Sequence, residues 1–316
     1  MKIVVLDGYL VNHDRQPWAV AERFPELFWY DETPDDLAAE RIADADAVFA
    51  NRTRIGRETM ERCPNLRYIG LFGTGYNIVD LAAARERKIT VCNVPEYSSF
   101  AVAQHTMALL LEATNRAAEF SALLAGGGWK KASDPAVTAL AMTELLGKTV
   151  GILGYGSIGR VFGNACQALG MRVLGYRRHP DGTEPAEMVD LPMLCRESDV
   201  LSIHCPLTDE TRGMIDAEFL AQMKRGAILL NTARGAILDE EAVAAALDSG
   251  QLMAAAVDVF SAEPAGLLHP LVRHPRCIKT PHVAWGAKET RARLLQIAAE
   301  NLFAFLEGRP QNVVGK

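Results

Sequence analysis

The fold is indicated most directly by the stretch TVGILGYGSIG, residues 149–159. Its first five residues are apolar, as in a buried strand, and a glycine-rich turn follows them. In such a turn Gly154 makes the tight bend, Gly156 lets backbone N–H groups approach a pyrophosphate, and Gly159 allows the next helix to pack on the strand. The N-terminus of that helix favours anions. The stretch therefore predicts a strand, turn and helix that bind a dinucleotide.

The residues that follow complete this unit. Apolar side chains recur at helical spacing from Ile158 to Leu169, and Gly170 ends the pattern. Residues 171–176, MRVLGY, then have the character of a second strand. A glycine-rich turn can also serve packing alone, but this strand, helix and strand order favours dinucleotide binding.

The end of the second strand indicates which nicotinamide cofactor binds. An Asp or Glu at this position would accept hydrogen bonds from the ribose 2′-OH of NAD, but Arg177 and Arg178 stand here. A carboxylate would repel a 2′-phosphate, whereas guanidinium groups bind it through charge-assisted hydrogen bonds. The sequence therefore favours NADP(H), with NAD(H) as the alternative. Two solvated arginines on a loop, or Asp181 serving an unphosphorylated ribose from beyond Pro180, are the competing interpretations.

Composition excludes several classes of protein. The 316 residues, 49% of them hydrophobic, suffice for two domains with cores. A net charge of −6 argues against nucleic-acid binding. No apolar run reaches transmembrane length and the first residues become charged too early for a signal peptide, so we expect a cytoplasmic protein that binds no membrane. Six cysteines without a CxxC pair predict reduced, buried thiols and no metal: Cys63, Cys92, Cys166, Cys195, Cys205 and Cys277.

Strand and helix patterns alternate along most of the chain. Buried strands at 2–7, 47–51 and 66–71 make the first 99 residues an α/β segment of their own. Residues 100–112 form a helix pattern that is hydrophobic on nearly every side, which predicts burial between layers.

Beyond the dinucleotide unit the alternation continues to an amphipathic helix at 288–306. It predicts an α/β fold with doubly wound parallel sheets, whose functional residues lie at the carboxyl ends of strands. The expected elements are 200–204, 217–223, 227–231, 240–247, 253–259 and 278–280.

Three strand ends carry side chains that suit the reduction of a 2-oxo acid. Hydride delivery to such an acid needs a forked cation for the carboxylate, an acid for the forming alkoxide, and a carboxylate that orients this acid. Arg234 in NTARG, His282 in TPHVAW and Glu263 in SAEP match these needs in that order. Each residue alone is more often structural. Together, downstream of a dinucleotide site, they predict a catalytic trio.

In these motifs the chain resembles the D-isomer-specific 2-hydroxyacid dehydrogenase family over almost its whole length. The matching stretches are GYGSIG (154–159), HCPLT (204–208), NTARG (231–235), VDVF with EP (257–264) and TPHVAW (280–285). Residues 74–77, TGYN, and Trp285 at the end of the TPHVAW motif are most similar to the glycerate dehydrogenase, or hydroxypyruvate reductase, branch. Residues 134–140 depart from the aromatic-rich segment of that branch.

The resemblance implies two Rossmann-like domains with a cleft between them. Residues 1–99 and 287–316 would form the substrate-binding domain, and residues 100–286 the dinucleotide-binding domain. Two long helices would cross between the domains, and a homodimer would form through the nucleotide domain.

The resemblance also implies roles for single residues. Arg234 would bind the substrate carboxylate and carbonyl, His282 would be the acid/base, and Glu263 would pair with it. Asp258 would contact the nicotinamide amide. The expected substrate contacts are Arg52, for which a structural salt bridge is the alternative, Thr74, Gly75, Arg234, His282 and Trp285. The other cofactor contacts would come from Thr106, Tyr155, Ser157, Ile158, His204, Cys205, Pro206, Thr211, Thr232 and Ala233.

The leading interpretation is a reductase that transfers hydride from NADPH to glyoxylate or hydroxypyruvate and forms glycolate or D-glycerate. One alternative is a dehydrogenase for a bulkier or phosphorylated D-2-hydroxy acid, although a phosphate would call for further cationic residues. The other is a nucleotide-sensing binding protein similar to the transcriptional corepressors that share this fold. Those can retain the trio, so the motifs leave this alternative open.

Overall fold

The computed structural model describes residues 1–130, 135–180 and 182–315. These residues form two sheets in which the paired strands run parallel, with strand orders β2-β1-β3-β4-β5 and β12-β11-β10-β9-β6-β7-β8. The predicted α/β class with parallel sheets is confirmed. The chain divides into two compact units, Met1–Ser98 with Trp285–Lys316, and Ser99–Ala284.

The first unit is built on the five-stranded sheet. Its three central strands are buried along their whole length, because helices cover both faces of a parallel sheet. The strands are β1 (Ile3–Val5), β2 (Leu27–Trp29), β3 (Ala47–Ala50), β4 (Tyr68–Leu71) and β5 (Thr90–Cys92). One core contains side chains of α3 (Ala38–Ile42), α4 (Arg57–Glu61) and α5 (Leu81–Glu86), and the other contains those of α1 (Gly8–Asn12), α2 (Ala19–Arg23) and α14 (Lys288–Leu306).

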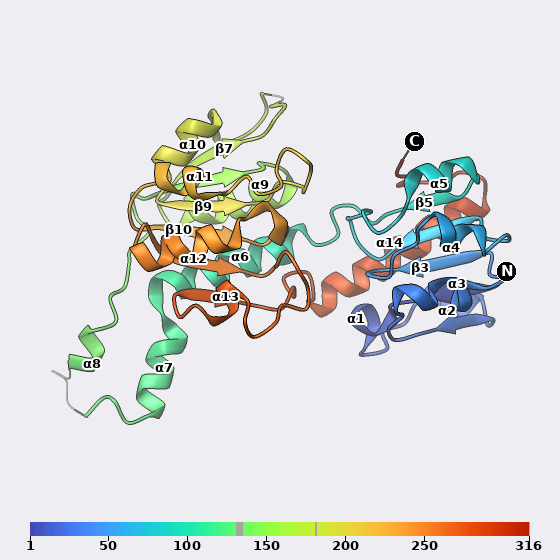
Figure 1. The fold of residues 1–316 in the computed structure, drawn as a ribbon, viewed down its shortest axis with the longest axis horizontal. Helices are drawn as coiled ribbons and strands as arrows, with labels where there is room; N and C mark the ends of the chain where they lie inside the picture. Colours follow the sequence, from blue (N-terminus) through green and yellow to red (C-terminus); the bar gives the residue numbers. More distant parts are fainter. Residues whose placement is uncertain (131–134, 181, 316) are drawn as a thin grey trace. The chain divides into compact units, whose positions relative to one another are not determined.

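Helix α14 returns the end of the chain to the first unit, so both marked termini lie there (Figure 1). Its bounds, Lys288–Leu306, are those predicted from the sequence. Leu294, Leu295, Ala298 and Leu302 form its buried stripe, at the spacing of an amphipathic helix.

The second unit is built on the seven-stranded sheet. Its strands are β6 (Thr149–Leu153), β7 (Arg172–Tyr176), β8 (Glu187–Met188), β9 (Val200–Ile203), β10 (Ala227–Asn231), β11 (Leu252–Val257) and β12 (Cys277–Lys279). One core contains side chains of α6 (Ser99–Asn115) and α9 (Ser157–Ala168), and the other those of α10 (Leu191–Glu197), α11 (Ala217–Gln222) and α12 (Glu240–Ser249). The chain runs outward from β6 in one direction and from β9 in the other. The carboxyl ends of β6 and β9 thus flank a switch point, where ligands of such sheets bind.

Helix α6 corrects one expectation. Its sequence is apolar on nearly every side, yet the helix is not buried all round, since Phe100 is 73% exposed. Val102, Leu109 and Leu110 are buried on the side that packs against α9 and the sheet. One face is sufficient for this packing, so the other apolar side chains stay accessible.

Helices α7 (Ala117–Ala125) and α8 (Pro135–Thr138) extend away from the seven-stranded sheet (Figure 1). Helix α7 is apolar but buries none of its residues. Of the stretch 134–140, which departs from the resembling branch, residue 134 lies outside the described part of the chain.

The prediction of buried cysteines without disulfides is confirmed, because all six side chains are buried and none forms a disulfide among the described residues. Among the described residues, no helix has the length and apolar character that a membrane span requires.

Candidate active site

The glycine-rich turn lies between β6 and α9, and each of its glycines meets a different requirement. Gly154 has a φ of +96°, and a Cβ there would lie 2.4 Å from the backbone N of Cys205. A Cβ at Gly159 would lie 2.8 Å from Ile152, so its absence lets α9 contact β6. At Gly156 an added Cβ would meet no atom within 4 Å. The backbone is therefore open at Gly156, beside the N-terminus of α9, where a pyrophosphate would bind.

A second observation at the switch point fits a bound cofactor. His204 follows β9, and its Nε2 lies 2.8 Å from the Ser202 hydroxyl. Its Nδ1 is buried and has no hydrogen-bond partner among the described residues. Burial lowers the pKa of His204 to about 3, so the ring is neutral. Because an unpaired buried nitrogen is costly, this atom is a candidate partner for a polar group of a ligand.

The two arginines after β7 are not simply solvated. Arg177 Nη1 donates to Glu184 Oε1 at 3.2 Å, and the Glu184 side chain is only 1% exposed. Arg178 forms an ion pair with Glu210. A 2′-phosphate would therefore have to join or displace these carboxylates, a competition that the sequence did not indicate. Asp181, the alternative ribose partner, lies outside the described residues.

Threonines order the other predicted cofactor contacts. The hydroxyls of Thr106 on α6 and Thr232 after β10 lie 2.9 Å apart, and both side chains are buried. Thr211 closes the loop after β9, because its hydroxyl donates to the Pro206 carbonyl at 2.8 Å and accepts from Thr208 N at 2.8 Å. In the same loop, burial raises the pKa of the Cys205 thiol to about 11, which keeps it protonated.

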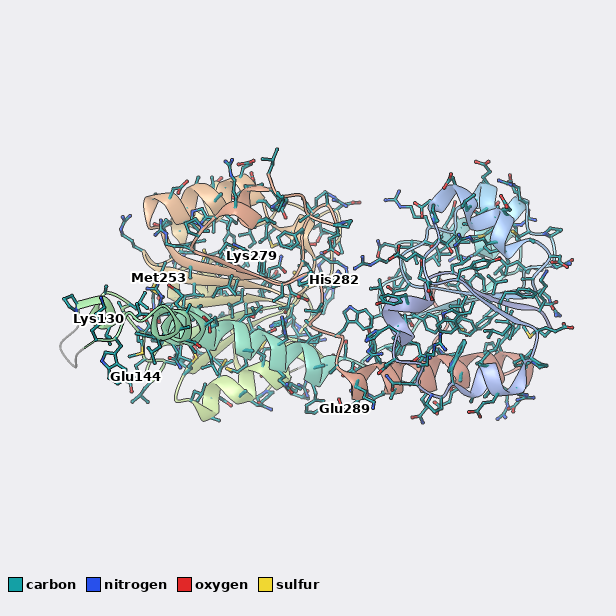
Figure 2. All side chains as sticks on the ribbon, turned by 90° about the horizontal axis from the view of Figure 1, so that it is seen from below. Lys130, Glu144, Met253, Lys279, His282 and Glu289 are labelled. Atoms are coloured by element: carbon teal, nitrogen blue, oxygen red, sulfur yellow. The ribbon has the colours of Figure 1, made fainter. Side chains whose placement is uncertain are left out.

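His282 and Glu263 form the most distinctive contact of the unit. They lie on the loops after β12 and β11, and His282 Nδ1 is 2.7 Å from Glu263 Oε2. The side chains are 30% and 22% exposed. Figure 2 labels His282 beyond Lys279, the last residue of β12. With Nδ1 donating to the carboxylate, Nε2 is the nitrogen that can exchange a proton with a substrate.

Asp258 holds the His282 loop. It is fully buried, and its carboxylate accepts hydrogen bonds from Val283 N, Ala284 N and the Thr280 hydroxyl at 2.9, 2.9 and 2.5 Å. Its carbonyl accepts from His282 N at 2.7 Å, and His282 has a φ of +56°. A left-handed conformation at a non-glycine residue needs such support. Sequence reasoning had given Asp258 only a contact to the cofactor.

His105 was not predicted from the sequence as a residue of the site. Its Nε2 lies 3.0 Å from the Thr280 hydroxyl and 3.6 Å from Asp258 Oδ1. It therefore extends the buried network under the His282 loop to helix α6. The available signal was a lone histidine within an apolar helix pattern.

Arg234 lies on the loop after β10, next to the loop of Glu263. The two loops touch, because a Cβ at Gly235 would lie 1.9 Å from the backbone of Phe260. The Asn231 side chain shapes the turn, since it donates to the Arg234 carbonyl at 2.9 Å and accepts from Ala233 N at 3.0 Å. The structure thus brings the loops of all three predicted trio members to one edge of the seven-stranded sheet.

The remaining predicted substrate contacts belong to the first unit. Arg52 and Thr74 follow β3 and β4, so they share the carboxyl edge of the five-stranded sheet with Gly75. The Asp7 carboxylate accepts from the backbone N of residues 51, 52 and 53 at 2.8, 2.9 and 3.0 Å and orders the turn of Arg52. The Thr74 hydroxyl donates to the Val94 carbonyl at 2.9 Å. Trp285 packs against a core of this unit.

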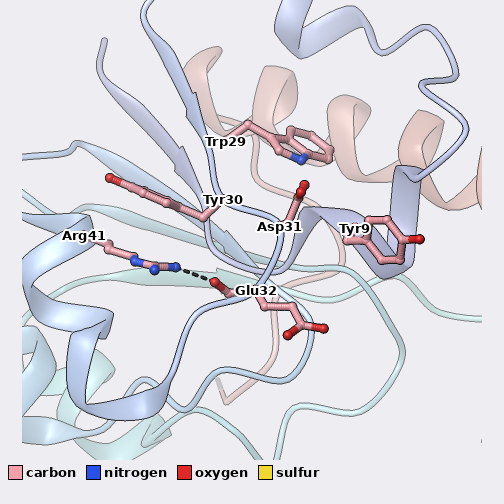
Figure 3. Close-up of a pocket in the computed structure, with 6 residues that line it drawn as sticks. All are labelled: Tyr9, Trp29, Tyr30, Asp31, Glu32 and Arg41. Atoms are coloured by element: carbon pink, nitrogen blue, oxygen red, sulfur yellow. Dashed lines mark hydrogen bonds between the residues drawn. The ribbon is translucent and has the colours of Figure 1, made fainter.

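A cavity of about 600 Å³ lies elsewhere in the first unit (Figure 3). It contains none of the predicted site residues. It is lined by Tyr9, Trp29, Tyr30, Asp31, Glu32 and Arg41.

Fold and site together define a dinucleotide-dependent oxidoreductase, and comparison with known proteins agrees. Residues 107–284 match the family model "D-isomer specific 2-hydroxyacid dehydrogenase, NAD binding domain". The chain therefore belongs to the D-isomer specific 2-hydroxyacid dehydrogenase family, whose members use a nicotinamide cofactor.

Individual relatives span the chain. A hydroxypyruvate reductase of Blautia hydrogenotrophica is 42% identical over 322 residues and covers 100% of both chains. A glyoxylate reductase of Korarchaeum cryptofilum is 37% identical over 305 residues, 94% of this chain and 91% of its own. Among solved structures, an acyclic imino acid reductase in complex with NADPH and D-Arg has 26% identity and a TM-score of 0.88, over 99% of this chain and 100% of its own.

The pairing of His282 with Glu263 predicts a change in pH dependence. A nearby negative charge stabilises the protonated imidazole. Glu263→Gln should therefore shift the limb of the kcat/KM profile that reports this protonation to lower pH. Initial rates of 2-oxo acid reduction across the pH range measure the shift. A profile that superimposes on that of the wild type would rule out the pairing.

The forked guanidinium of Arg234 predicts a specific loss on conservative substitution. Arg234→Lys keeps the charge but replaces two parallel donors by one ammonium, which cannot reproduce a bidentate contact with a carboxylate. We expect KM for the 2-oxo acid to rise about 10-fold or more, which corresponds to the loss of one charge-assisted hydrogen bond. Steady-state kinetics test this. If KM is unchanged, Arg234 does not bind the substrate carboxylate.

Proposed function

We propose that the protein reduces glyoxylate or hydroxypyruvate with NADPH and forms glycolate or D-glycerate. The observation that carries the proposal is the contact of 2.7 Å between His282 and Glu263, with the loop of Arg234 beside it. The relatives named hydroxypyruvate reductase and glyoxylate reductase support this choice of substrates.

The residues divide the chemistry among them. Arg234 binds the substrate carboxylate and presents the carbonyl carbon, to which a bound nicotinamide cofactor would supply hydride. His282 in its protonated form gives the Nε2 proton to the forming alkoxide oxygen. Glu263 holds the ring by Nδ1, so that Nε2 is the nitrogen left to donate the proton. Arg52, Thr74 and Gly75, at the carboxyl edge of the five-stranded sheet, stay predicted substrate contacts.

The cofactor would be held at the switch point of the seven-stranded sheet. The turn at Gly154, Gly156 and Gly159 would receive the pyrophosphate, and Arg177 and Arg178 the 2′-phosphate. A phosphate has more charge than the carboxylates that now pair with these arginines, so it would compete well for them. This supports a preference for NADPH over NADH.

The stereochemistry of the product tests this proposal. Hydroxypyruvate should be converted to D-glycerate, which chromatography on a chiral phase separates from the L form. L-glycerate would contradict the proposed formation of D-glycerate. Turnover of phosphorylated or bulky acids alone would favour the alternative dehydrogenase activity.

We also propose a homodimer formed through helix α7. This helix is apolar and buries none of its residues, and Leu124 and the nearby Trp129 are 50% and 58% exposed. Apolar surface of this kind marks an interaction site. Wild-type protein should sediment as a dimer in analytical ultracentrifugation, and Leu124→Glu should give monomers. The control variant Leu306→Glu changes an exposed leucine of the first unit and should remain dimeric. A monomeric wild type would refute the proposal.

A further inference from the structure

A second histidine and carboxylate pair lies behind the loop that carries Glu263. Glu240, the first residue of α12, has its Oε2 3.0 Å from His269 Nε2. Its carboxylate also accepts from Ser261 N at 2.9 Å and from the Ser261 hydroxyl. The side chains of Glu240 and His269 are only 10% and 11% exposed. A carboxylate this buried requires partners, and its donors here are Ser261 and His269.

The orientation of His269 is determined by its other contacts. Leu271 N donates to His269 Nδ1 at 3.3 Å, so Nδ1 accepts and Nε2 carries the hydrogen that faces Glu240. The ring also meets Phe260 edge-on, with centroids 5.1 Å apart at 79°. Because Glu240 accepts hydrogen bonds from Ser261 and from His269, it connects the two ends of the loop from Phe260 to His269.

The contact of Glu240 with Ser261 is linked to the candidate active site through the backbone of Phe260. Phe260, the neighbour of Ser261, donates its backbone N–H to Glu263 Oε1 at 3.1 Å. The other oxygen, Oε2, receives His282 Nδ1. The position of the Phe260–Ser261 backbone therefore sets which way the Glu263 carboxylate faces.

Phe260 packs against the core of the unit at the start of the loop. Towards the other end, Leu267 and Leu268 are 87% and 86% exposed, so they supply no buried anchor there. The first turn of α12 does not need Glu240 as a cap either, because the Asp239 side chain already accepts from Ala242 N at 3.0 Å. The buried Glu240 carboxylate is thus available to the loop alone.

We propose that Glu240 is a positioning residue for the Glu263–His282 pair. It acts through Ser261 and Phe260 on the Glu263 carboxylate, and so on the proton transfer of the proposed reduction, without contacting substrate. This role of Glu240 rests on the proposed function, because it concerns the proton transfer assigned to His282.

The kinetic test uses a neighbouring glutamate as control. Glu240→Gln places an amide against the Nε2–H of His269 and should lower kcat about 10-fold, while KM changes less than about 2-fold. Glu241→Gln makes the same change on an exposed side chain of the same helical turn and should retain wild-type kinetics. Ser261→Ala removes only the hydroxyl that donates to Glu240, so it should lower kcat by a smaller factor than Glu240→Gln. This second variant tests the proposal even if Glu240→Gln does not fold.

A double-variant cycle separates positioning from general stability. If Glu240 acts through Glu263, then adding Glu240→Gln to Glu263→Gln should lower kcat by less than about 2-fold further. A full additional 10-fold loss, or unchanged kcat in both Glu240→Gln and Ser261→Ala, would overturn the proposal.

A titration that requires no turnover distinguishes this inference from the proposed function. The His282 ring signal, identified by its loss in His282→Ala, can be followed by NMR against pH. The His282 ring contacts the Glu263 carboxylate, and its backbone N–H donates to the carbonyl of the buried Asp258. Glu240→Gln and Glu241→Gln leave both of these carboxylates in place. The midpoint in Glu240→Gln should move to lower pH, as in Glu263→Gln, and Glu241→Gln should match the wild type. An unmoved midpoint refutes positioning, whereas absent 2-oxo acid reduction by the wild type refutes the proposed function alone.

Discussion

Replacing His282 by alanine should lower kcat about 10²–10⁴-fold and leave cofactor binding near that of the wild type. The imidazole is the proposed proton donor, and its contact with Glu263 orients Nε2 for that transfer. Because the glycine turn and the arginines after β7 are untouched, the cofactor should still bind. Steady-state kinetics and fluorescence titration with NADPH measure the two quantities.

His13→Ala is the matched control for this variant. His13 is an exposed histidine in the first unit, outside the proposed chemistry, and its loss should not change kcat. Wild-type turnover in His282→Ala would remove His282 from the mechanism. A loss of NADPH binding equal to the loss of kcat would instead indicate damage to the fold of the unit.

Exchanging Arg177 for aspartate should remove most of the preference for NADPH. A charge-assisted hydrogen bond contributes roughly 1.5–3 kcal/mol, so two arginines on a 2′-phosphate favour NADPH by about 10²-fold or more. Arg177→Asp removes one attraction and adds a repulsion, and it also breaks the pair with Glu184. The ratio of kcat/KM for NADPH to that for NADH measures the change.

Two comparisons make this prediction specific. Glu184→Gln removes the negative charge that pairs with Arg177 and should raise the preference for NADPH. High salt should weaken NADPH binding more than NADH binding, because it screens the additional phosphate charges. Equal catalytic efficiency of the wild type with both cofactors would show that the arginines do not select the cofactor.

The sequence predicted the elements that have strong periodicity or long apolar runs. Strand β6 at Thr149–Leu153 and helix α14 at Lys288–Leu306 have the predicted bounds. Strand β2 at Leu27–Trp29 was missed, because it is a short edge strand with one exposed residue and so has no clear pattern. Its place in the sheet depends on pairing with β1, which is not encoded in the local sequence.

In the candidate site, too, residues within sequence motifs were predicted and contacts between distant parts of the chain were not. Residue type and motif were sufficient to propose Arg234, Glu263 and His282. The supporting contacts of Asp258, which was predicted only as a cofactor contact, and of Glu240 were not predicted, because a carboxylate gives no local sign of its partners. Glu240 meets His269 across 29 residues of sequence, and Asp7 meets the turn of Arg52 across 45. Only the folded chain brings such groups together.

The most direct test of the account is an assay of purified protein for oxidation of NADPH and of NADH with a panel of 2-oxo acids. The panel should contain glyoxylate, hydroxypyruvate, pyruvate and a phosphorylated analogue, and loss of nicotinamide absorbance reports turnover. We predict the highest kcat/KM with NADPH and glyoxylate or hydroxypyruvate. Cofactor binding without turnover of any of these acids would contradict the account and favour a nucleotide-sensing binding protein.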